Sequence, residues 1–273
     1  MSDHSVLIVV VLYNKSLFEC NTYHTLIKDC GCDVYIHDNS PIPQHHSSDF
    51  PKKWHYVPDT SNPGLSVAYN HAAQYAKEKG CAWMLLTDQD TLFGHDILKE
   101  YLDVMREEQN IKLIVPPMSV RNGVYLSPVK GGPLKAQLRD SVPYGIQSLY
   151  NYSPINSGMM VNVAAFFEIG GYNECVKLDF SDFQFVSRLR QQYPDFYVLK
   201  TTCVQDFSNC VQNAEQKVTR FVLFCESLRE YQGATIWENL EVFLVVLNRC
   251  LSLSMSLKSM KPCKIFIKKY CLL

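Results

Sequence analysis

The sequence predicts a doubly wound α/β unit followed by a helical C-terminal segment. In the first half, short apolar, β-branched runs alternate with helix-forming stretches, and short loops separate them, as in repeated βα units. The chain has 273 residues, 47% hydrophobic and 19% charged, which excludes wholesale disorder, collagen and a coiled coil. The formal net charge of −1 gives no reason to expect a nucleic-acid partner.

Five strands and three helices are expected in the first half. The run Val6–Leu12 is apolar throughout, which is typical of a central parallel strand covered on both faces. Gly80 follows a helical stretch and is expected to end it. The remaining strands are predicted at 34–37, 54–57, 83–86 and 113–115, and the helices at 16–28, 65–79 and 96–107.

The second half is less regular. Residues 118–153 contain scattered Gly and Pro and predict a flexible or β-hairpin insertion. An apolar run at 159–163 and helices at 164–169 and 183–192 follow, and the pattern is helical from about residue 216. We therefore divide the chain into an α/β unit, 1–215, and a helical, basic C-terminal segment, 216–273.

The cysteines and the N-terminus favour a cytoplasmic protein. The eleven cysteines are odd in number and form no CxxC pair, so free thiols in a reducing compartment are expected. The N-terminal apolar run lacks a basic region before it and a cleavage site after it, and therefore predicts a buried strand instead of a signal peptide. No run of 18 apolar residues predicts a membrane-spanning helix.

Polar clusters follow three of the predicted strands, at the end of a parallel sheet where ligands bind. They are Asn14, the run Asp38-Asn39-Ser40 and the run Asp88-Gln89-Asp90. Glycine-rich phosphate-binding fingerprints are absent, so carboxylates that hold Mg²⁺ or Mn²⁺ are the next candidate for binding a nucleotide. A single Asp-x-Asp is more often a solvated turn or a helix N-cap, but the three clusters together favour a binding site.

Six motifs in one order resemble the inverting family 2 glycosyltransferases with a GT-A fold, over roughly residues 5–210. The resemblance is closest to the rhamnosyltransferase-like branch that builds bacterial O-antigens and capsules. The motifs are VVLYN at 10–14, DNS at 38–40, NPGLSVAYN at 62–70, LLTDQDT at 85–91, NSG at 156–158 and IGGYNE at 169–174.

The resemblance implies a role for individual residues. Asp182, in the segment DFSDFQ at 179–184, takes the place of the catalytic base, and Mg²⁺ or Mn²⁺ is the implied cofactor. The implied donor-nucleotide residues are Asn14, Asp38, Asn39, Asn62, Gly64, Asn70 and Asp88. The implied metal ligands are Asp88, Asp90 and Gln205, and the implied acceptor residues are Asn156, Ser157 and Asp179.

Two departures from the family pattern keep other functions open. Gln184 and Gln205 stand where the family usually has Glu and often has His, which leaves open a degenerate transferase that serves as a scaffold. An aspartyl-nucleophile phosphatase also uses Asp-x-Asp after a strand. It requires Thr or Val two residues after the second Asp, where this chain has Leu92, so this alternative is disfavoured.

The resemblance implies transfer of a sugar from a nucleoside-diphosphate donor to a lipid-linked saccharide in O-antigen, lipopolysaccharide or capsule synthesis. After Glu241 the chain has six basic residues and no acidic one. Lysines interleaved with Ile265, Phe266, Ile267 and Tyr270 predict an interfacial segment, and hence peripheral attachment to the inner face of the plasma membrane. A helix packed on the domain is the alternative for this segment.

Overall fold

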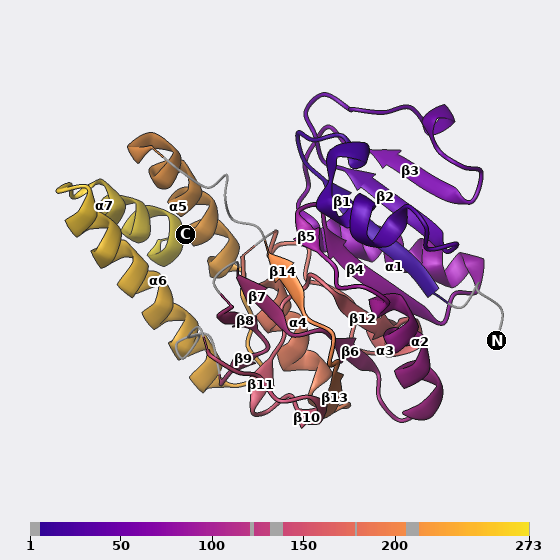
Figure 1. Cartoon of the computed structure of the whole chain (residues 1–273). Coiled ribbons are helices and arrows are strands. Elements are labelled where there is room, and N and C mark those ends of the chain that lie inside the picture. Colours follow the sequence, from indigo (N-terminus) through magenta and orange to yellow (C-terminus); the bar gives the residue numbers. More distant parts are fainter. Residues whose placement is uncertain (1–5, 121–122, 132–138, 178, 206–212, 273) are drawn as a thin grey trace.

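The computed structural model describes residues 6–120, 123–131, 139–177, 179–205 and 213–272. An eight-stranded sheet forms the centre of the α/β body (Figure 1). Its strand order is β10 (Gly145–Ser148), β13 (Asp195–Val198), β6 (Leu113–Val115), β12 (Met159–Asn162), β4 (Trp83–Asp88), β1 (Val6–Leu12), β2 (Asp33–Asp38) and β3 (Trp54–Pro58).

The central sheet is mostly parallel. Strands β3, β2, β1 and β4 run in one direction, whereas β12 is antiparallel to both of its neighbours and β10 is antiparallel to β13. All seven residues of β1 are buried, and alternate residues enter two separate apolar clusters, one on each face of the sheet. The continuous apolar run at Val6–Leu12 is therefore explained by burial on both faces.

Helices cover both faces of this sheet. Helices α1 (Leu65–Lys79), α3 (Val163–Glu168) and α4 (Ser181–Leu189) pack on one face, and α2 (Ile97–Glu107) packs on the other. Gly80 ends α1 in the left-handed conformation, with φ 72°, as its place in the sequence predicts. The predicted fold class is confirmed.

The helix predicted at 16–28 is wrong as a single element. The chain forms a 3-10 turn at Leu17–Glu19 and a short π-helix at Tyr23–Ile27, with Cys20 extended between them. The interruption has a tertiary cause. The side chain of Asn21 donates to the carbonyl of Asp90 at 3.0 Å, and that of Thr22 donates to the carbonyl of Thr91 at 3.1 Å.

The insertion at 118–153 forms short strands where the structure describes it. A four-stranded sheet has the order β5 (Thr91–Leu92), β14 (Cys203–Gln205), β7 (Met118–Val120) and β8 (Tyr125–Ser127), and a second pair joins β11 (Tyr152–Ser153) to β9 (Val129–Lys130). The hairpin alternative for this region is the better description, because β7 and β8 pair antiparallel.

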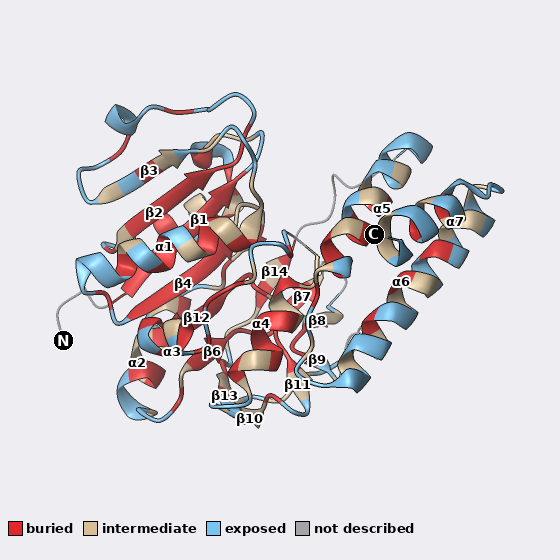
Figure 2. Cartoon of the chain, turned by 180° about the vertical axis from the view of Figure 1, so that it is seen from behind, coloured by how far each residue is buried: buried red, intermediate tan, exposed pale blue. Residues whose placement is uncertain are grey.

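Three helices follow the α/β body: α5 (Ala214–Arg229), α6 (Ile236–Ser256) and α7 (Lys261–Phe266), with a π-helical turn at Ile267–Cys271. They share an apolar cluster of their own, beside the sheet (Figures 1 and 2). Phe180 and Phe183, at the start of α4, pack against this cluster, so these helices touch the body next to Asp182. Among the described helices, none has the length and hydrophobicity that crossing a bilayer requires.

Candidate active site

The Asp88–Asp90 turn is held at the carboxyl end of the sheet by contacts with distant segments. Asp88 is the last residue of β4, and its carbonyl accepts a hydrogen bond from the Thr22 hydroxyl. The backbone N–H of Tyr13, just after β1, donates to the side-chain oxygen of Gln89 at 2.9 Å. These bonds fix the turn beside the end of β1, where the sequence predicts a binding site.

Two other carboxylates act on Asp88 at this end of the sheet. Burial raises the pKa of Asp88 to about 7, and the negative charges of Asp90 and Asp182 add to the shift. Burial also raises the pKa of Asp182 to about 6, with a further contribution from Asp179. Aspartates that lie far apart in the sequence are therefore gathered in one acidic region, as the predicted roles require.

The acidic region suits a hard divalent cation. Within the described part of the chain, no three His, Cys, Asp or Glu side chains come together in a group that could hold a metal. Mg²⁺ is commonly held by one or two carboxylates together with substrate phosphates, and Asp88 and Asp90 match that pattern. A bound cation would also relieve the repulsion that raises the pKa of Asp88.

Gln205 contacts Asp90, but through its nitrogen. Its side-chain NH₂ donates to Asp90 Oδ1 at 3.1 Å, and its Oε1 accepts from the Thr91 hydroxyl at 2.9 Å. A metal ligand would use Oε1, which here is occupied by Thr91. In the described structure Gln205 therefore orients Asp90. Direct coordination of a metal ion by Gln205 Oε1 stays a prediction, and it requires rotation of the side-chain amide.

Asp182 lies in the first turn of α4, one residue inside the helix, although the sequence predicts it just before the helix. Phe180, at the N-cap, has φ 68°, an uncommon conformation for a bulky residue. Asp182 Oδ1 accepts from the backbone N–H of Phe183 at 2.8 Å. The strained N-cap and the aromatic pair Phe180 and Phe183 place this half-buried carboxylate at the edge of the acidic region.

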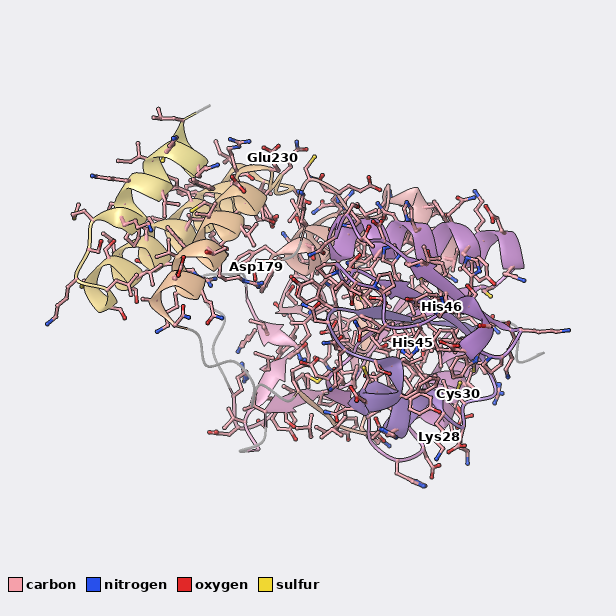
Figure 3. The ribbon with its side chains drawn as sticks, turned by 90° about the horizontal axis from the view of Figure 1, so that it is seen from above. Lys28, Cys30, His45, His46, Asp179 and Glu230 are labelled. Atoms are coloured by element: carbon pink, nitrogen blue, oxygen red, sulfur yellow. The ribbon has the colours of Figure 1, made fainter. Side chains whose placement is uncertain are left out.

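A cavity of about 790 Å³ lies where the α/β body meets the C-terminal helices. Four of the predicted site residues line it: Asn39, Asn62, Gly64 and Asp179. Asp179 thus lies in the same cavity as the predicted nucleotide residues, although the resemblance assigns it to the acceptor. Figure 3 shows Asp179 at this junction and Glu230, another lining residue, on the helical side.

Four further residues of this cavity were not predicted from the sequence: Tyr13, Lys177, Arg220 and Arg229. Arg220 and Arg229 belong to α5, and Arg220 donates to Asp179 Oδ1 at 2.8 Å. The helical pattern of 214–229 could not predict this contact, because Arg220 and Asp179 are 41 residues apart in the sequence. Tyr13 lies within the VVLYN motif, which could have singled it out.

The side chains of Asp38 and Asn70 form hydrogen bonds with other parts of the protein in the described structure. Both oxygens of the fully buried Asp38 are occupied, by the N–H groups of Ser40 and Gln44 and by the Tyr56 hydroxyl at 2.7 Å. The side chain of Asn70 is bonded in both directions to the backbone of Tyr172, and it does not appear in the lining of the cavity. A direct contact of either residue with the donor stays a prediction.

Asn14, Asn156 and Ser157 also support neighbouring elements. Asn14 has φ 52°, and its N–H donates to the Ser40 hydroxyl at 2.8 Å. The Ser157 hydroxyl accepts from the backbone N–H of Asp88 at 3.3 Å, and Asn156 donates to the Ser181 hydroxyl at 3.2 Å. Because Asn156 and Ser157 are buried, the structure brings them to the site as supports of Asp88 and α4, and their predicted acceptor role stays untested.

Gly64 is required by both its conformation and its surroundings. Its φ is 103°, and a Cβ at this position would lie 2.5 Å from the carbonyl oxygen of Lys177. The same carbonyl accepts from the N–H of Leu65 at 2.8 Å, so the start of α1 is pressed against the 177 segment at the cavity wall.

Replacing Gly64 with Ala is expected to destabilise the protein by about 1–3 kcal/mol, because it adds both backbone strain and a clash with main chain. In a chain of this size, each kcal/mol lowers the melting temperature by about 2–4 °C, which thermal unfolding measures. Gly31→Ala is the matched control, because Gly31 also has positive φ but an added Cβ would meet nothing within 4 Å. Equal losses in the two variants would contradict the importance of the Lys177 contact.

The chain is similar in sequence to one known transferase. No family model matches the chain. The chain is 25% identical over 191 residues to the dTDP-rhamnosyl transferase RfbF of Shigella flexneri, a match that covers 68% of this chain and 63% of that protein's length.

Two solved structures share the fold. S. aureus TarS 1–349 in complex with UDP-GlcNAc superposes with a TM-score of 0.56 at 15% identity, over 97% of this chain and 79% of that one. The mannosyltransferase PcManGT from Pyrobaculum calidifontis, in complex with GDP-Man and Mn²⁺, superposes with a TM-score of 0.53 at 13% identity, over 96% of this chain and 73% of that one. The shared fold shows that this chain has the α/β architecture of these glycosyltransferases, and the sequence match relates it to a rhamnosyl transferase.

Proposed function

We propose that the protein is an inverting glycosyltransferase that moves a sugar from a nucleoside-diphosphate donor to a hydroxyl of a lipid-linked saccharide. The observation that carries this proposal is the position of Asp182 within the electrostatic reach of Asp88, three residues after Asp179, which lines the large cavity. The rhamnosyltransferase relative and the UDP-GlcNAc and GDP-Man complexes of the structural neighbours support a nucleotide-sugar donor.

The cavity suits a nucleotide. Its volume of about 790 Å³ lies within the range of small-molecule and cofactor sites. Tyr13 offers an exposed ring for stacking. Lys177, Arg220 and Arg229 are the positive side chains for a diphosphate, which would replace Asp179 and Glu230 as partners of the two arginines. We infer that the nucleotide occupies this cavity with its diphosphate directed towards Asp88 and Asp90.

Asp182 suits the role of general base. In the proposed reaction its carboxylate takes the proton of the acceptor hydroxyl, whose oxygen bonds to the anomeric carbon as the bond to the diphosphate breaks. Attack on the face opposite the leaving group inverts the configuration of that carbon. With its pKa raised to about 6, Asp182 is still ionised at neutral pH and is a stronger base than an ordinary aspartate.

A divalent cation held by Asp88 and Asp90 would neutralise the charge that develops on the leaving diphosphate. The Mn²⁺ complex of a structural neighbour supports the use of such a cation. Gln205 fixes Asp90 for this task through its hydrogen bond of 3.1 Å. We propose Mg²⁺ or Mn²⁺ as the cofactor.

The relative's name supports rhamnose as one donor sugar, and we place the reaction in bacterial O-antigen, lipopolysaccharide or capsule synthesis at the cytoplasmic face of the membrane. The test is release of nucleoside diphosphate from a panel of nucleotide sugars, with and without Mn²⁺ or Mg²⁺, followed by transfer to a lipid-linked acceptor. Donor binding without turnover of any sugar would instead favour the scaffold alternative that Gln184 and Gln205 leave open.

Replacing Arg220 with Gln is expected to weaken donor binding by about tenfold or more. The substitution removes a charge-assisted hydrogen bond to the diphosphate, worth about 1.5–3 kcal/mol. Donor affinity is measured by calorimetry or by the thermal shift that the nucleotide sugar produces. Arg106→Gln is the matched control, because Arg106 pairs with Asp103 on the exposed side of α2. An unchanged affinity in Arg220→Gln would remove this residue from the proposed donor site.

A further inference from the structure

Helix α6 is apolar on two opposite faces, and the described residues of the protein cover one of them. Val242, Val246 and Cys250 face inwards and are buried in the apolar cluster of the C-terminal helices. A second row of large apolar side chains is exposed on the opposite side. Successive members of this row are three, four, seven and four residues apart. This spacing places them on one face of the helix. We call it the outer stripe of α6: Trp237, Leu240, Leu244, Leu251 and Met255.

The outer stripe is long and has one polar interruption. Trp237 is 71% exposed, Leu251 48% and Met255 73%. From Trp237 to Met255 the stripe extends for about 27 Å along the helix axis, and Asn248 is the polar residue within the row. Figure 2 shows exposed residues along the outer side of α6. Single exposed apolar residues are normal on a protein surface, whereas a contiguous row indicates a contact with a partner.

Positive charge follows the end of the stripe. After Met255 the chain turns through exposed lysines into α7, and no acidic residue occurs after Glu241. Lys269 is paired with Glu226 at 2.6 Å. The exposed lysines are Lys258, Lys261, Lys264 and Lys268. An apolar stripe that leads into a group of lysines complements a surface with anionic headgroups above hydrocarbon.

We propose that the outer stripe of α6 docks on a lipid bilayer that contains anionic lipids, with the helix lying in the plane of the membrane and the four exposed lysines on the headgroups. Glu238 and Arg249 lie elsewhere around the helix and Glu241 lies at the edge of the stripe, and these charges match an interfacial helix and not a spanning one. A second copy of the chain is the poorer partner, because its matching surface carries the same positive lysines and offers no anionic groups to complement them.

The docking surface differs from the segment that the sequence singles out. Phe266 is buried, and Ile265 and Tyr270 pack against the same apolar cluster as Val242. Of the predicted interfacial side chains, Ile267 is the exposed one. We therefore place the apolar membrane contact on the outer face of α6 and not on α7. The lysines still contact the lipid headgroups, as the sequence predicts.

Docking through α6 would bring the donor cavity near the membrane. Helix α5 lies between the two: Leu223 and Glu226 line the cavity, and Phe221 and Phe224 share the apolar cluster with the inner face of α6. Helix α5 and α6 itself then lie between the cavity and the bilayer, so the saccharide of a lipid-linked acceptor would have to extend past these two helices to reach the donor. This consequence rests on the proposed function, whereas the docking itself does not.

The test is cosedimentation of the full chain with vesicles of phosphatidylcholine alone and of phosphatidylcholine mixed with phosphatidylglycerol, in the absence of donor and acceptor. The protein is expected to bind the mixed vesicles and to be released by salt. Changing Leu240, Leu244 and Leu251 together to Ser is expected to weaken binding by about a hundredfold. Changing Lys258, Lys261 and Lys264 to Gln is expected to cost about fivefold per lysine.

Ile42→Ser is the matched control, because Ile42 is 75% exposed but lies in the loop after β2, and its vesicle binding should equal that of the unchanged protein. A second measurement is the blue shift of tryptophan emission on adding vesicles, which should be lost in Trp237→Leu. Unchanged binding by the triple serine variant would overturn the proposal. So would a dimer that becomes a monomer in that variant while vesicle binding stays the same. Because no sugar transfer is measured, failure of the proposed activity leaves this result unaffected.

Discussion

Replacing Asp182 with Asn is expected to lower the rate of sugar transfer by about 10²–10⁴-fold while leaving donor binding intact. The amide has nearly the shape of the carboxylate but cannot accept the proton of the acceptor hydroxyl. Its Oδ1 can still accept from the N–H of Phe183, so the first turn of α4 keeps its local bond. The comparison is made by measuring kcat for transfer together with donor affinity in both proteins.

Two further measurements separate loss of the base from loss of the fold. The rate of the unchanged enzyme should fall as the pH drops through about 6, because Asp182 then takes up a proton. The folded pKa lies above the unfolded value near 3.9, so the ionised group opposes folding at neutral pH, and this cost disappears as the pH falls below 6. Asp182→Asn should therefore be at least as stable as the unchanged protein at pH 7. Full transfer activity in this variant would rule out Asp182 as the base.

Replacing Asp90 with Asn is expected to weaken metal-dependent donor binding by about 10²-fold or more, since a carboxylate ligand of a hard cation is lost. The substitution keeps an oxygen that can accept from Gln205, so the local hydrogen bond survives. Donor affinity is measured as a function of Mn²⁺ and Mg²⁺ concentration. The unchanged protein should show a strong dependence that a chelator abolishes, and Asp90→Asn should show little.

Asp103→Asn is the control for this experiment, because it removes one negative charge from an exposed pair on α2. It should bind donor and metal as the unchanged protein does. Donor binding that is equally strong with a chelator, in both the unchanged protein and Asp90→Asn, would contradict a metal site at Asp88 and Asp90 and would point to the arginines of α5 as the diphosphate contacts.

Local patterns predicted the elements whose causes are local. The helix at 65–79 and its end at Gly80 have the predicted bounds, as does the strand at 6–12, because periodicity and a glycine stop act within a few residues. The helix at 16–28 failed for the opposite reason. The side chain of Thr22 bonds to the 88–91 turn, a contact that no local pattern records.

The same division applies to the site. The order of its motifs along the sequence predicted Asp88, Asp90 and Asp182 in one place, and the structure brings them together. The sequence could not predict that the side chains of Asp38 and Asn70 would form hydrogen bonds with neighbouring protein groups. A motif indicates that a residue belongs to a site. The direction in which the side chain of that residue points depends on the neighbouring residues in the folded protein.

By itself the sequence determined the order of strands and helices, the acids that follow the strands and the basic character of the C-terminus. Tertiary structure alone decided that Arg220 meets Asp179 in the cavity, and that α6 covers one of its two apolar faces and exposes the other. The physical reason is that hydrophobicity along a chain reveals which faces are apolar, but burial depends on which distant segment packs against each face.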